Sequence, residues 1–174
     1  MPCGRVRLLV YDGRPLHLMA PEPGHSHPRT GRPAASSETV RANMARQKRR
    51  DTGCEMAVRR LLHAAGIRYR VDFRPLPDQR FRVDIGWRNR KLAVFIDGCF
   101  WHGCPDHGTL PKNNREWWSD KLRANAQRDR RTDELLRARG WTVLRYWEHE
   151  DPDHVASTIR KHLMQRAASG GDPT

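Results

Sequence analysis

Residues 81–107 read FRVDIGWRNRKLAVFIDGCFWHGCPDH, and this stretch decides the fold. Apolar and polar side chains alternate over residues 81–87, which is typical of a half-buried strand. Residues 89–90 suit a turn, and residues 92–96 form a continuous apolar run with the length and β-branched character of a buried central strand. The stretch therefore predicts a β-hairpin whose second strand stops at Asp97.

Two carboxylates belong to this hairpin. Asp84 lies near the middle of the first strand, pointing away from its apolar side, and Asp97 ends the second strand. If the strands pair, these side chains converge, and Mg²⁺ prefers one or two carboxylates with water and phosphate oxygens. We therefore expect a Mg²⁺ site at Asp84 and Asp97. The alternative is that Asp97 and Gly98 only end a strand, as Asp-Gly pairs often do.

Cysteines and histidines follow at the spacing of metal ligands. Cys99, Cys104 and His107 form the pattern C-x4-C-x2-H, and His149 follows a later strand pattern. Two cysteines and two histidines make a closed tetrahedral zinc set, which contributes folding energy rather than reactivity. We expect these four residues to hold a structural Zn²⁺, the alternative being unrelated buried thiols and surface histidines. His102 lies within the cluster, and as a zinc ligand it could not serve as a base.

Length and charge narrow the class of protein. The chain has 174 residues, which suits one α/β domain, and a formal net charge of +13. So basic a chain is expected to bind a polyanion, with nucleic acid as the first candidate. A ribosome-associated or membrane-surface protein would share the charge but would not explain the carboxylates and the zinc set. The chain has four cysteines, and two of them lie beside histidines, which favours a metal site in a reducing compartment over disulfides.

The remaining sequence predicts a domain between two tails. Residues 1–36 are poor in apolar pattern and are expected to be a disordered tail, and residues 168–174 a disordered C-terminus. The domain covers residues 37–167 and starts with a basic, helix-compatible arm, residues 37–50. Without an apolar run of transmembrane length or a signal sequence, we expect a cytoplasmic, nucleoid-associated protein.

Further elements follow from capping and periodicity. Residues 52–55 form a capping box that starts a helix ending at Gly66, and residues 67–73 alternate as a strand. Residues 114–139 predict two helices or one bent helix before Gly140. Residues 141–147 are apolar on both faces, which indicates a central strand, and a last helix is expected over residues 153–165.

The motif DGCFWHGCP, followed by REWW, NAQRDRR and GWTVLRYWEH, resembles the very short patch repair (Vsr) family of bacterial mismatch endonucleases over roughly residues 37–153. The resemblance implies an α/β fold with a restriction-endonuclease-like core, a central mixed β-sheet flanked by helices. It also implies a nick 5′ to the thymine of a T:G mismatch that deamination of 5-methylcytosine leaves. The implied partners are double-stranded T:G DNA, mismatch-repair factors and a DNA polymerase, and the expected state is a monomer.

The resemblance also implies roles for individual residues. Glu55 of the capping box matches the family's active-site glutamate, a role that its capping does not exclude. The family inserts an aromatic trio between base pairs, which falls here on Phe100, Trp101 and Trp118; simple packing against the zinc site is the alternative. Members also use the N-terminal arm on DNA. The predicted DNA contacts come from this arm and from a basic face over residues 112–131, and they are Arg46, Lys48, Arg49, Arg128 and Arg130.

The expected chemistry is metal-assisted hydrolysis of a phosphodiester. Asp84, with the carboxylate or carbonyl of Asp97, holds Mg²⁺, and His102 activates water. Either Glu55 or Asp129 orients the imidazole, and the products carry a 3′ hydroxyl and a 5′ phosphate. Two alternatives stay open: a restriction-type endonuclease without mismatch specificity, and a non-catalytic, zinc-stabilised DNA-binding module.

Overall fold

A computed structural model of the chain describes residues 37–46 and 51–168. The predicted tail over residues 1–36, the arm residues Lys48 and Arg49, and residues 169–174 lie outside the described residues. The elements are α1 (Glu38–Arg46), α2 (Gly53–Ala64), β1 (Arg70–Phe73), β2 (Val83–Trp87), β3 (Leu92–Asp97), α3 (Cys99–His102), α4 (Arg115–Ala138), β4 (Thr142–Trp147) and α5 (Pro152–Ala168). The last helix, α5, continues through Ala168.

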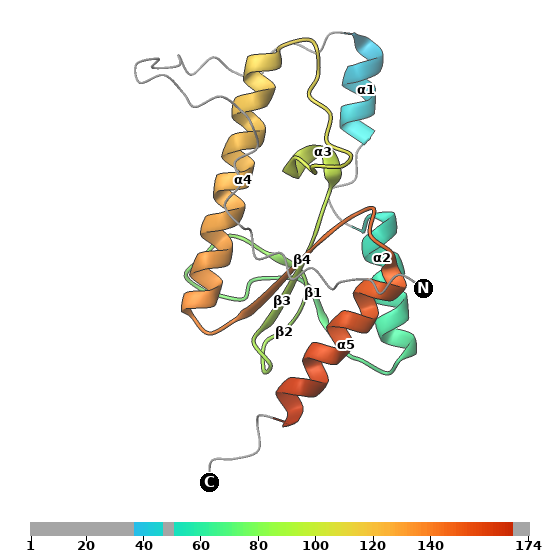
Figure 1. Ribbon diagram of the computed structural model, residues 1–174, viewed down its shortest axis with the longest axis vertical. Coiled ribbons are helices and arrows are strands. Elements are labelled where there is room, and N and C mark those ends of the chain that lie inside the picture. The colour runs from blue at the N-terminus through green and yellow to red at the C-terminus, as the bar shows by residue number, and fades with distance from the viewer. Residues whose placement is uncertain (1–36, 47–50, 169–174) are drawn as a thin grey trace. The chain divides into compact units, whose positions relative to one another are not determined.

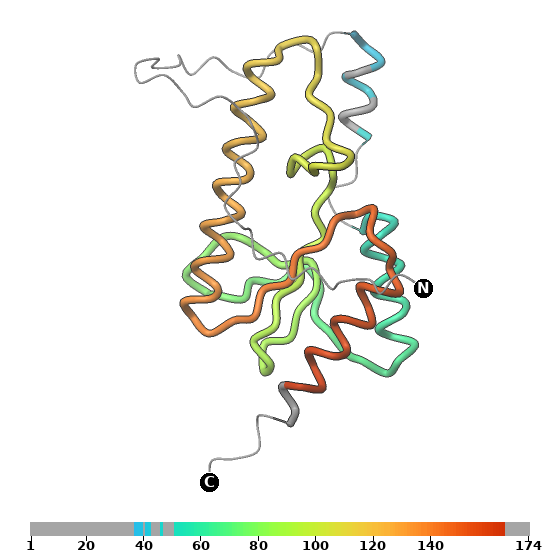
Figure 2. The backbone as a smooth tube through the Cα atoms, viewed as in Figure 1, coloured from blue at the N-terminus to red at the C-terminus, as the bar shows by residue number. Residues whose placement is uncertain are grey.

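The four strands form one mixed sheet in the order β1-β2-β3-β4. β1 and β2 pair antiparallel, as do β2 and β3, which confirms the predicted hairpin. β4 pairs parallel to β3, and the chain makes this crossover through α3 and α4 (Figure 2). Every residue of β3 is buried, which confirms the apolar run as a central strand.

Helices cover both faces of the sheet, with α4 on one side and α2 and α5 on the other (Figure 1). The core between the sheet and α2 and α5 includes Leu62, Val94 and Ile159. The core on the α4 side includes Phe95 and Leu136. The predicted α/β fold with a central mixed sheet flanked by helices is confirmed.

Two local predictions differ from the structure, and one that had two alternatives is decided by it. β4 is an edge strand of the sheet and not a central one; its apolar residues are explained by the helices that cover both of its faces. Residues 115–138 form a single helix, which Gly140 terminates with a φ of 77°. β1 begins only at Arg70, whereas the strand was predicted from residue 67. Ile67 and Tyr69 lie before the strand, and their apolar character is explained by packing against the core. Among the described helices, none is long and apolar enough to span a membrane.

Candidate active site

Asp84 lies where β2 and β3 separate. The paired register of these strands ends at Ile85 and Val94, and beyond it the Asp84 Oδ2 accepts a hydrogen bond of 2.8 Å from the Ile96 N–H. The Asp84 side chain thus accepts the Ile96 N–H in place of a main-chain carbonyl of β2, because β2 and β3 are no longer paired at this point. Burial raises the pKa of this carboxyl to about 7, since the Ile96 hydrogen bond only partly offsets the desolvation and the nearby charge of Glu55 adds to it.

Asp97, at the end of β3, is paired with an arginine that the sequence analysis missed. Both carboxylate oxygens of Asp97 accept hydrogen bonds of 2.7 Å from the Arg145 Nη1. Arg145 projects from β4, and Asp97 is buried. The predicted Mg²⁺ ligation by the Asp97 carboxylate would therefore compete with this ion pair. The signal in the sequence was a charged residue inside the apolar strand pattern TVLRYW.

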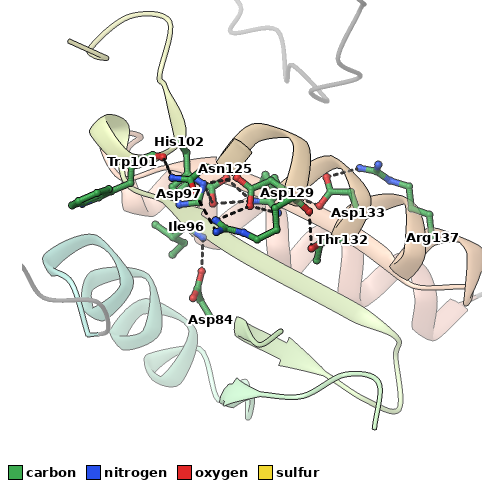
Figure 3. A network of polar contacts seen from close by, with 12 residues as sticks. Asp84, Ile96, Asp97, Trp101, His102, Asn125, Asp129, Thr132, Asp133 and Arg137 are labelled. Carbon is green, nitrogen blue, oxygen red and sulfur yellow. Dashed lines mark hydrogen bonds and ion pairs between the residues drawn. The ribbon is translucent and has the colours of Figure 1, made fainter. Parts of the chain in front are cut away.

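His102, the last residue of α3, is oriented by Asp129 of α4 (Figure 3). Its Nδ1 lies 2.6 Å from the Asp129 Oδ2 and 3.5 Å from the Asp97 Oδ1. A carboxylate only accepts hydrogen bonds, so Nδ1 carries the proton and Nε2 is the basic nitrogen. Burial lowers the pKa of His102, but the hydrogen bond to Asp129 and the charge of Asp97 outweigh it, and the pKa lies above 6.5.

Glu55 completes the capping box and is not the partner of His102. Its Oε2 accepts a 2.9 Å hydrogen bond from the Asp51 N–H, and its Oε1 accepts one of 3.1 Å from the Thr52 hydroxyl. The Thr52 hydroxyl in turn accepts the Glu55 N–H, which starts α2 as predicted. Of the two residues expected to orient the imidazole, the structure places Asp129 there, and the charge of Glu55 acts on Asp84 instead.

The four predicted zinc ligands lie together, their ligand atoms all within 4.8 Å of one another. The Cys99 Sγ is 3.0 Å from the His149 Nδ1, and the Cys104 Sγ is 3.9 Å from the His107 Nδ1 and 3.8 Å from the His149 Nδ1. Donors around one tetrahedral Zn²⁺ would stand about 3.3–3.8 Å apart, and the separations of 3.0 to 3.9 Å lie on either side of this range. Two thiols and two imidazoles are also ligand types that Zn²⁺ prefers, so the donor set suits this ion. His102 does not belong to the cluster and remains available as a base.

The aromatic trio sits on α3 and α4. Phe100 and Trp101 belong to a short helix rather than a loop, and their ring centroids are 5.1 Å apart. Trp118 lies 5.1 Å from the Phe100 ring and 5.9 Å from the Trp101 ring, and it is buried. The Asn125 side chain donates a 2.8 Å hydrogen bond to the Trp101 carbonyl, which ties α3 to α4. Phe100 and Trp101 are half-buried and form the accessible part of the trio.

The predicted DNA-contacting arginines are exposed where they are described. Arg46, at the end of α1, and Arg128 and Arg130, on α4, are all exposed. Arg128 also lies 3.5 Å from the Asp129 Oδ1, so the basic surface of α4 borders the His102 pair. The site thus joins a half-buried carboxylate suited to a cation, a basic imidazole nitrogen and an arginine surface suited to phosphate.

A family model described as DNA mismatch endonuclease Vsr matches residues 35–106. The type II nicking enzyme V.NaeI of Lentzea aerocolonigenes is 48% identical over 120 residues, which span 67% of this chain and 72% of that enzyme. The DNA mismatch endonuclease Vsr of Escherichia coli is 36% identical over 109 residues, or 61% and 67% of the two chains. A solved homing endonuclease catalytic domain shows a weaker likeness, with a TM-score of 0.46 and 21% identity over 67% of this chain and 98% of that domain.

The family model and the relatives show that this chain is a DNA endonuclease, an enzyme that cuts DNA at internal phosphodiester bonds. This chain belongs to the Vsr family of DNA mismatch endonucleases, as its motifs indicate, and relatives within that family are named nicking enzymes.

Proposed function

We propose that this endonuclease nicks one strand 5′ to the thymine of a T:G mismatch, as the first step of very short patch repair of deaminated 5-methylcytosine. The observation that carries the proposal is the His102 and Asp129 pair, 2.6 Å apart, on the same two helices, α3 and α4, that hold the aromatic trio. The non-catalytic alternative loses its support, because the family consists of endonucleases.

In this proposal Asp84 is the principal Mg²⁺ ligand, helped by main-chain oxygen at the end of β3. A carboxyl group with a pKa raised to about 7 by burial gains from a nearby cation, which fits the role. Bound Mg²⁺ would neutralise charge on the scissile phosphate and on the departing 3′ oxygen. His102 takes a proton from water at Nε2, and Asp129 keeps the Nδ1 proton in place throughout.

Recognition is assigned to the surface beside this site. Phe100 and Trp101 would enter the base stack at the mismatch, where unstacking is cheapest. Arg46, Arg128 and Arg130 would contact phosphates, and the exposed positions of all three support this. The relatives named type II nicking enzymes keep the second candidate open, an endonuclease that cuts matched sites as part of a restriction system.

A nicking assay on paired duplexes tests the proposal. One duplex carries a T:G pair and the other T:A in the same sequence, each with Mg²⁺ and with Ca²⁺ in its place. We expect a single nick with a 5′ phosphate on the T:G duplex, only in Mg²⁺. His102→Ala should abolish it, while His154→Ala, at an exposed histidine of α5, should leave it unchanged. Equal cutting of both duplexes would favour the restriction-type candidate.

A further inference from the structure

Arg145 stands among three carboxylates from two other elements. Besides the bonds to Asp97, its Nε donates a 2.9 Å hydrogen bond to the Asp133 Oδ1, and its Nη2 lies 3.8 Å from the Asp129 Oδ1. Only 16% of its side chain is exposed. This mostly buried guanidinium joins the end of β3 to two turns of α4.

The guanidinium is held rigidly and permanently charged. Its central carbon lies 4.3 Å from the centroid of the Phe95 ring, so the ring face supports it from one side. The carboxylates of Asp97 and Asp133 hold the planar guanidinium in place through hydrogen bonds to its nitrogens. A guanidinium also does not lose its proton in proteins. Arg145 is therefore a fixed positive charge inside the site.

Arg145 and His102 share two of these carboxylates. Asp129 and Asp97 lie 2.6 Å and 3.5 Å from the His102 Nδ1, and both also face Arg145. A divalent cation placed between Asp97 and Asp129 would meet the guanidinium. The position that a second metal ion could use in a nuclease is thus already filled by a side chain.

We propose that Arg145 is a positioning residue that takes the place of a second divalent cation. It neutralises Asp97 and holds Asp97 and Asp129 where they orient His102, so that the site needs only the cation at Asp84. This inference rests on the proposed function for its kinetic consequences. The binding of divalent ions by the DNA-free protein tests it separately.

The kinetic test compares Arg145→Met, which keeps an unbranched stem and removes the guanidinium, with Arg145→Lys and Arg137→Met. Arg137 is the matched control, because it pairs with Asp133 at 3.4 Å from an exposed position and touches neither Asp97 nor Asp129. We expect kcat to fall roughly 100-fold in Arg145→Met, as for a misplaced catalytic group, with KM within about threefold of the parent. Arg145→Lys should be intermediate, since lysine restores the charge but not the fork. A loss that appears in KM, or an equal loss in Arg137→Met, would overturn the inference.

The binding test titrates the zinc-loaded, DNA-free protein with Mn²⁺ and counts bound ions by electron paramagnetic resonance. The parent and Asp97→Ala should bind one ion with equal affinity, and Arg145→Met should bind a second ion at the released carboxylates. If Asp97→Ala abolishes Mn²⁺ binding, or if Arg145→Met binds no additional ion, Arg145 does not replace a cation. If Arg145→Met fails to fold, Arg145→Lys decides through its kcat. A parent that nicks no duplex would refute the proposed function and leave this titration valid.

Discussion

Asp84→Asn should stabilise the protein while it abolishes nicking. The substitution keeps the shape of the side chain, and the amide oxygen can still accept the Ile96 N–H at the 2.8 Å distance. What it removes is the negative charge of a partly desolvated carboxylate. The pKa of Asp84 rises from 3.8 to about 7 on folding, so the folded protein holds its proton more tightly than the unfolded chain does. The stability that this proton provides is full below pH 3.8 and is lost as the pH rises through about 7.

The size of the effect follows from that shift. A difference of about 3 pKa units corresponds to an upper limit of about 4 kcal/mol at a pH well above 7. Each kcal/mol raises Tm by roughly 2–4 °C in a protein of this size. We therefore expect Asp84→Asn to melt several degrees above the parent at pH 8 in Mg²⁺-free buffer, with little difference near pH 4.

Thermal melts across this pH range, beside nicking assays, decide the point. Ca²⁺ should raise the Tm of the parent and not that of Asp84→Asn, because only the carboxylate holds the ion firmly. A control is Asp153→Asn, which changes an exposed carboxylate in the first turn of α5, far from Asp84 in sequence. A Tm gain that does not grow with pH, or persistent nicking, would refute the assignment of Asp84 as a desolvated metal ligand.

Three other substitutions test the remaining parts of the site. Cys104→Ser should lose the expected zinc ion, one per chain, in elemental analysis and should unfold at a lower temperature. The control Cys54→Ser, at a cysteine outside the cluster, should keep the zinc ion and the unfolding temperature of the parent. A Cys104→Ser variant as stable as the parent would reject the zinc site. Replacing Phe100 and Trp101 with Ala should weaken binding to T:G DNA at least about tenfold and leave matched DNA nearly unaffected in titrations at fixed salt. Equal losses on both duplexes would make the two rings structural supports. Asp129→Asn should lower kcat by roughly 10²–10⁴ with an unchanged KM, because the amide no longer enforces one imidazole tautomer; an active variant would contradict this role.

Local sequence patterns predicted most of the elements of the fold. The unbroken apolar run at residues 92–96 predicted a strand covered on both faces, and β3 is such a strand. The capping box at residues 52–55 starts α2, as its spacing predicted. The apolar pattern of residues 141–147 did not distinguish a central strand from an edge strand. Periodicity reports which faces are covered by helices, and it does not report whether another strand pairs beside them.

The site was predicted less completely, because its ion pairs join residues far apart in the chain. The four proposed zinc ligands were found from spacing, since short intervals between cysteine and histidine are constrained by one ion. Arg145 was missed: its partner Asp97 is 48 positions away, and no local pattern links them. The same distance explains why the orienting partner of His102 stayed open between Glu55 and Asp129 until the helices were placed.

The parallel pairing of β3 with β4 also has a consequence for how the protein is made. Cys99 and His149 are 50 positions apart, and Arg145 arrives only with the last strand. A chain that grows from its N-terminus on the ribosome therefore carries Asp84, His102 and Asp129 before Arg145, which pairs with Asp97 and lies 3.8 Å from Asp129. Because β4 must be synthesised and must dock before the site is assembled, we expect no nascent fragment that ends within α4 to cut DNA.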